Sequence, residues 1–123
     1  MKWPKLEDMT VNQLVERFTG IGIEQDQAIL RDQHARFNRL FDEMVAVQDE
    51  LKIRDGDRRQ ELLSLYNHPN AQVRLNAAKV TLAVAPEPAR RALQAIADSR
   101  EYPQAGDAGM SIWNLERGIF KPT

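Results

Sequence analysis

Apolar residues recur along most of the chain at the three- and four-residue spacing of helices, and no segment alternates apolar and polar residues as a strand would. The first apolar stripe starts at Val11, where Thr10 is placed to cap a helix. Gly20 and Gly22 follow and are expected to end it. The pattern predicts an all-α fold that begins with one short helix.

A second stripe predicts one long helix over about residues 24–53. At 1.5 Å per residue, such a helix would be about 45 Å long. The spacing fits either a core-facing helix of a bundle or the seam of a coiled coil, which leaves a homodimer through this helix as an open alternative. The stripe is formed by Leu30, Phe37, Leu40, Met44, Val47 and Leu51.

Turn residues divide the remainder into shorter helices. A turn at residues 54–57 separates an N-terminal helical cap, residues 1–55, from residues 56–123, within what we interpret as a single domain of 123 residues. Breaks at residues 67–70, 86–88 and 102–103 then predict helices over about 58–66, 71–85, 89–99 and 105–117. Gly118 is expected to stop the last helix, with Trp113 in the core and residues 119–120 folded back onto it.

The segment 62–83 resembles a HEAT repeat, in which a leucine-rich helix, an Asn-x-Pro turn and a Val-Arg helix with paired alanines follow one another. A second break at Pro103, 34 residues after Pro69, has the period of a helical solenoid. The second unit is degenerate, and residues 1–53 do not match. The matching residues are Leu62, Leu63, Asn67, Pro69, Val73, Arg74, Ala77 and Ala78.

This resemblance implies two HEAT-like antiparallel hairpins stacked in a right-handed α–α superhelix after the N-terminal cap. The whole chain is similar to a small bacterial family known only as a domain of unknown function. HEAT-like proteins mostly bind other proteins through their second helices, here 71–85 and 105–117. The resemblance therefore points to partner contacts at Gln72, Arg74, Asn76 and Lys79. For Arg74 it also implies the alternative of structural hydrogen bonds between repeats. Trp113 is a further candidate for a partner contact, because tryptophan is enriched at interface hot spots.

Charge and composition narrow the function. The net charge is −1 and there is no cysteine, which disfavours a dedicated nucleic-acid protein and excludes disulfides and thiolate catalysis. No secretory signal or membrane-length apolar run is found, so we expect a cytoplasmic protein. Nucleic-acid binding by the basic residues of segment 54–91 stays the alternative. These residues are Arg54, Arg58, Arg59, Arg74, Lys79, Arg90 and Arg91.

The candidate chemistry is sparse. His34 and His68 are the two histidines, and His34 has no ligand type at the i and i+4 spacing that a metal site would use. No nucleophile motif or phosphate-binding loop occurs. We therefore predict no catalytic, metal or cofactor site. The prediction is a non-enzymatic protein-binding module, an adaptor or an inhibitor of the immunity type.

Overall fold

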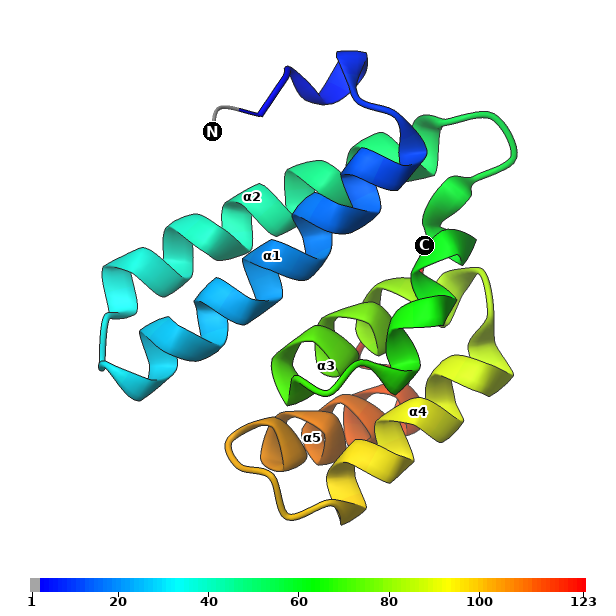
Figure 1. Ribbon diagram of the computed structural model, residues 1–123. Coiled ribbons are helices and arrows are strands. Elements are labelled where there is room, and N and C mark those ends of the chain that lie inside the picture. The colour runs from blue at the N-terminus through cyan, green and yellow to red at the C-terminus, as the bar shows by residue number, and fades with distance from the viewer. Residues whose placement is uncertain (1–2) are drawn as a thin grey trace. The chain divides into compact units, whose positions relative to one another are not determined.

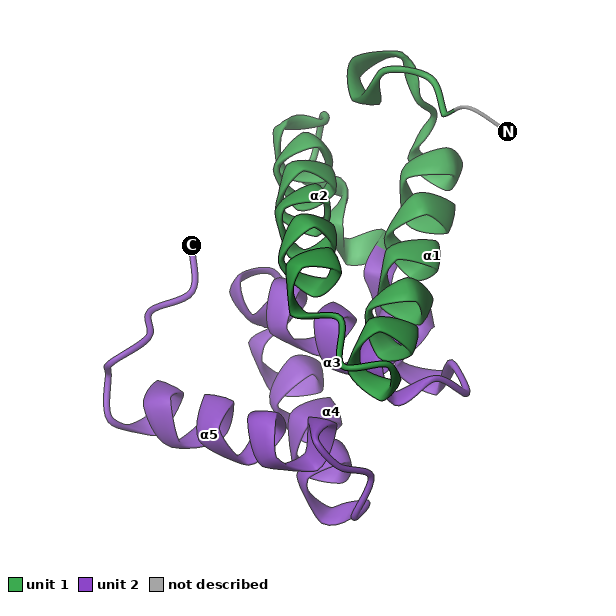
Figure 2. Cartoon of the chain, turned by 90° about the vertical axis from the view of Figure 1, so that its left-hand side faces the viewer, with its two compact units in different colours: residues 1–61 green, residues 62–123 purple. Residues whose placement is uncertain are grey.

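The computed structural model describes residues 3–123, and every regular element within them is helical (Figure 1), which confirms the all-α prediction. The chain forms two compact units, residues 1–61 and residues 62–123 (Figure 2). The boundary falls a few residues after the turn at residues 54–57 that was predicted to separate the cap from the rest.

The first unit is a helical hairpin. Helix α1 (Val11–Leu30) and helix α2 (His34–Ile53) run antiparallel side by side (Figure 1), and a short 3-10 helix, η1 (Leu6–Asp8), precedes them. Thr10 caps α1 as predicted: its hydroxyl accepts from the Gln13 N–H at 3.1 Å, and the Gln13 side chain accepts from the Thr10 N–H at 2.9 Å. Arg54 donates to the carbonyls of Leu6 and Met9 and so ties η1 to the end of α2.

Helix α1 does not stop at the glycines, and that prediction was wrong. The buried residues of the helix continue at helical spacing through and beyond Gly20 and Gly22. A glycine in a helix interior costs about 1 kcal/mol relative to alanine, whereas burying one large apolar side chain gains about 1.5–3 kcal/mol. Packing therefore outweighs the local preference. The buried residues of α1 are Leu14, Phe18, Ile21, Gly22, Gln25 and Ala28.

The predicted long helix is instead the last third of α1, a turn, and α2. Asp32 adopts a left-handed conformation with φ of 56°. The Gln33 N–H bonds the Ala28 carbonyl at 2.8 Å and the Asp32 N–H bonds that of Ile29 at 3.2 Å, which is the Schellman pattern that ends a helix. The homodimer alternative assumed one continuous helix over residues 24–53, and the chain forms two helices there instead. Leu30, the first residue of the predicted stripe, is 79% exposed, whereas the stripe from Leu40 onward is buried.

The second unit packs three α-helices around one core. Its elements are α3 (Ala71–Val80), η3 (Thr81–Ala83), α4 (Pro86–Asp98) and α5 (Gln104–Glu116), preceded by the 3-10 helix η2 (Arg58–Asn67), which begins in the first unit. Helix α4 packs against both α3 and α5. The core is formed by Leu75, Ala78, Leu82, Ala89, Leu93, Ile96, Ala108 and Ile112.

Local signals explain where these helices begin. Asn70 caps α3, since its side-chain oxygen accepts from the N–H groups of Gln72 and Val73 at 2.9 and 3.2 Å. Pro86 was expected to end a helix but starts α4 instead, because the first turn of a helix needs no N–H from proline. Asp57 precedes η2 and accepts from the backbone and the guanidinium of Arg59.

Two further predictions for the C-terminal segment were wrong. Trp113 is 46% exposed instead of lying in the core, and Ile119 and Phe120 are 65% and 48% exposed instead of folding back onto it. Gly118 does end α5 as predicted, with φ of 70°. Helix α5 turns a different face inward, formed by Ala105, Ala108 and Ile112.

Candidate functional site

Two of the predicted contact residues lie inside the protein. Gln72 and Asn76 are only 6% and 5% exposed. The Gln104 amide donates to Gln72 at 3.1 Å, and the Gln72 amide donates to Asn76 at 3.0 Å. This amide chain joins α5 to α3 in a buried position. Gln72 and Asn76 are therefore corrected from surface contacts to structural groups, because buried amides persist only when they are hydrogen-bonded.

Arg74 and Lys79 stay at the surface but are already paired. Arg74 donates to Glu101 at 2.8 Å, and Lys79 donates to Asp107 at 3.0 Å. Both pairs join α3 to the segment around the start of α5. Neither side chain is therefore a free cation.

The basic residues considered for nucleic-acid binding are mostly paired as well. Six of the seven have a carboxylate partner within 4.0 Å, each inside its own unit: Arg54, Arg58, Arg59, Arg74, Lys79 and Arg90. Arg91 alone has none among the described residues. Phosphate binding depends on cations that can replace counterions. These ion pairs therefore weaken the case for nucleic-acid binding by this segment.

The outward face of α5 carries large apolar side chains. Met110 is 59% exposed and Trp113 46% exposed, and their spacing of three residues places them on one face. The Arg117 guanidinium lies 4.4 Å from the centre of the Trp113 ring, a cation–π contact. At the other end of the face, Tyr102 is 72% exposed and its ring lies beside Gly106.

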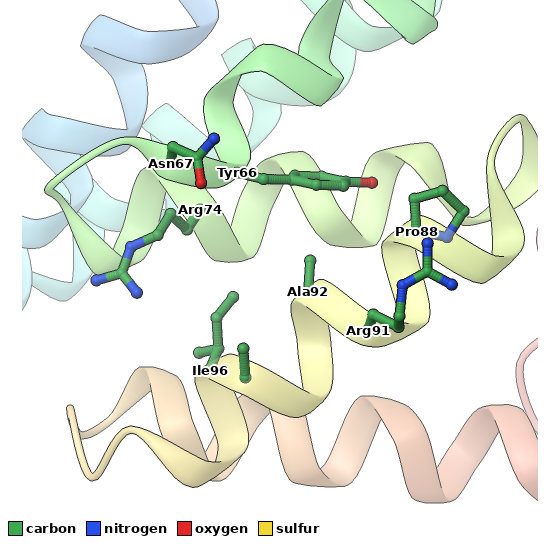
Figure 3. A pocket seen from close by; sticks show the side chains of 8 residues that line it. Tyr66, Asn67, Arg74, Pro88, Arg91, Ala92 and Ile96 are labelled. Carbon is green, nitrogen blue, oxygen red and sulfur yellow. The ribbon is translucent and has the colours of Figure 1, made fainter.

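A groove of about 330 Å³ lies between the end of η2, the start of α3 and one side of α4. The Tyr66 ring forms one wall, opposite Ala92 (Figure 3). Arg91 lies beside Pro88 at one end of the groove, and the Arg74 guanidinium lies at the other (Figure 3). The remaining lining residues are Asn67, Ala95 and Ile96.

Tyr66 is fixed in this wall by its hydroxyl. Thr81 gives its only proton to the Ala77 carbonyl at 2.8 Å, so the Tyr66 hydroxyl is the donor in its short hydrogen bond with Thr81. Burial raises the pKa of the Tyr66 phenol. The phenol is therefore a neutral structural group near neutral pH.

Neither histidine is among the residues that line the groove. His34 starts α2, is 85% exposed in its side chain and lies 2.8 Å from Asp32. His68 accepts the Asn70 N–H at 3.0 Å through Nδ1, which supports the turn before α3. Within residues 3–123 no three carboxylates or histidines gather as metal ligands would. No helix in that range is long and apolar enough to cross a membrane.

The sequence analysis did not identify the outward face of α5 as a whole, and it did not identify the groove beside Tyr66. Met110 was assigned to the last helix without a role, although its spacing from Trp113 and the flanking glycines, Gly106 and Gly109, could have indicated an outward apolar face. Tyr66 was read only as the end of a helix. No local signal marks it as a groove wall, because the groove forms only when α4 packs beside it.

Comparisons with known proteins agree with the fold. Residues 12–116 match the family described as Domain of unknown function (DUF2019). The chain is also similar to the protein RPA1889 from Rhodopseudomonas palustris CGA009, known from a crystal structure: the TM-score is 0.94 and the sequences are 55% identical over 98% of this chain and 100% of that one. No curated protein matches the chain.

Proposed function

The chain belongs to the DUF2019 family, and we propose that it is a non-enzymatic protein-binding module of the cytoplasm, an adaptor or inhibitor that binds its partner through the outward face of α5. The observation that carries the proposal is the exposure of Tyr102, Met110 and Trp113 along this one face.

The chemistry of the face suits a protein partner. Tryptophan and tyrosine are enriched among the residues that dominate interface energies, and methionine adapts to irregular apolar surfaces. Gly106 and Gly109 carry no side chains, so a partner can approach the helix closely between the large residues. Arg117 has no carboxylate partner among the described residues. We therefore expect a partner that presents an apolar surface with an acidic group at its edge.

The HEAT-like pattern of residues 62–83 gives weaker support. Proteins with such repeats mostly bind other proteins, and α5 corresponds to the second helix of the second predicted hairpin. Nucleic-acid binding is not proposed, because carboxylates within the protein already neutralise six of the seven basic residues on which it rested.

The test is quantitative affinity capture from an extract of the source cells, followed by mass spectrometry. The variant Met110→Ser with Trp113→Ser is compared with the wild type and with a matched control, Leu30→Ser with Ile53→Ser. The control also removes two exposed apolar side chains, 79% and 76% exposed, but from the first unit. The wild type and the control should enrich the same partner, and the α5 variant should retain less than about a tenth of it.

The purified wild type and control should then bind the captured partner with similar affinity, and the purified α5 variant should bind it more weakly. Equal capture by the α5 variant would contradict the proposed face, and the absence of any partner specific to the wild type and the control would contradict the proposed function. A urea titration of each variant shows that the fold is unchanged.

A further inference from the structure

We propose that the groove between Tyr66 and α4 binds a small, flat organic acid, with Arg91 holding its carboxylate. This site is separate from the outward face of α5, and the proposal does not rest on a protein partner. It rests on unused hydrogen-bond donors at both ends of a concave apolar surface.

The first observation is the state of Arg91. It is exposed and lines the groove, and it has no ion pair or hydrogen bond among the described residues. Its neighbour Arg90 points elsewhere and pairs with Glu116 at 3.3 Å. Glu87 lies one turn before Arg91, yet the two side chains are not paired. Arg91 is therefore a cation beside a cavity with both its charge and its donors available to a ligand.

The second observation is at the opposite end. The Nε of Arg74 is buried and has no hydrogen-bond partner, although the same guanidinium donates to Glu101 through Nη2. The amide of Asn67, which also lines this end, makes no hydrogen bond among the described residues. The Arg74 Nε is closed to solvent, so the Asn67 amide is the donor at this end that a ligand can reach.

The walls between these ends select a flat apolar body. The Tyr66 ring faces Ala92 across the groove (Figure 3), and the bond with Thr81 holds the ring in place. Ala92 and Ala95 leave space along α4 that larger side chains would fill. A volume of about 330 Å³ is at the small end of the range for ligand pockets, which favours a compact molecule. Stacking on tyrosine favours a planar ring.

These features define the ligand class. A planar ring with a carboxylate at one end and a hydrogen-bond acceptor at the other would place the carboxylate at Arg91 and the acceptor near the Asn67 amide. We use 4-hydroxybenzoate as the probe for this class. Benzamide keeps the ring without the charge, and acetate keeps the charge without the ring.

The experiment is a titration of the ¹⁵N-labelled full chain with each probe, in which NMR records the chemical-shift changes of the backbone amides. Saturable shifts from 4-hydroxybenzoate should map to residues around Tyr66 and along α4, and both benzamide and acetate should bind at least fivefold more weakly. Arg91→Gln should weaken 4-hydroxybenzoate binding by about five- to tenfold, the loss expected for one charge-assisted contact at a partly exposed site.

Two further variants make the result decisive. Arg90→Gln is the matched control, because it removes the same charge from the preceding residue of α4 and should leave the affinity unchanged. Ala95→Leu alters an exposed position of the groove wall and should abolish the shifts while the urea midpoint stays the same. The proposal is overturned if 4-hydroxybenzoate gives no saturable shifts at the groove, if benzamide binds equally well, or if Arg91→Gln and Arg90→Gln have the same effect.

Discussion

The buried amide chain between α3 and α5 gives a direct test of the packing. Gln104 donates to Gln72 across the two helices at 3.1 Å, and both residues are nearly fully buried, at 3% and 6% exposure. Replacing either glutamine with methionine keeps the volume but leaves the other amide without this partner. Each single change should therefore lower the free energy of unfolding by about 1–3 kcal/mol.

The double variant separates this bond from general disturbance of the core. When both partners become apolar, no amide is left unpaired by the loss of this bond, so the combined effect should be smaller than the sum of the single effects. The expected coupling is about 1 kcal/mol, the net value of one hydrogen bond. The measurement is urea unfolding followed by circular dichroism for the wild type, Gln72→Met, Gln104→Met and the double variant. Unchanged slopes would show that the midpoints report stability.

A different result is expected if the Gln72 side chain is exposed to solvent instead of buried. If Gln72 pointed into solvent, as the sequence pattern suggested, Gln72→Met would change stability by less than about 0.5 kcal/mol, and the two changes would simply add. That outcome would contradict the packing of α5 against α3.

Three more predictions follow from other elements. Asp32→Gly should raise the free energy of unfolding by about 0.5–1 kcal/mol in urea titrations, because glycine adopts the left-handed conformation freely, whereas Asp32→Ala should lower it. Leu93→Ala should lower it by about 2–5 kcal/mol, since this fully buried side chain lies in the core of the second unit; a loss under 1 kcal/mol would argue against that core. The Arg59 guanidinium holds the pKa of Asp57 below its ordinary value of 3.8, so the ion pair stabilises the fold above that pH and the gain is lost as pH falls below about 4. The stability difference between wild type and Asp57→Asn should accordingly shrink between pH 6 and pH 3, and a constant difference would exclude this role.

The two errors in predicting where α1 ends have different physical causes. Gly20 and Gly22 suggested a helix end because glycine is the commonest helix stop, but the side chains around them pack as one continuous face. Asp32 carries the true stop without the glycine that usually marks it. Aspartate tolerates the left-handed conformation well enough for the backbone bonds of the Schellman turn to form there.

The direction in which a helical side chain points was also not predictable from the sequence. The helix that carries Trp113 could be located, but not the direction in which the side chain points. That direction depends on which face of α5 meets α4, and Ala105, Ala108 and Ile112 compete successfully for the inward position. Gln72 shows the opposite: it is polar, yet it is buried, because Gln104 on α5 donates a hydrogen bond to it.

What the sequence alone determined is the set of features that a few neighbouring residues decide. The helical content, the cap at Thr10, the break before α3 and the stop at Gly118 depend on local hydrogen bonds and backbone preferences, which act within about four residues. The tertiary structure alone decided that α1 runs through its glycines, that Trp113 faces outward and that a groove opens between Tyr66 and α4. Each of these depends on which surfaces are buried together, and burial is a sum over residues far apart in the chain.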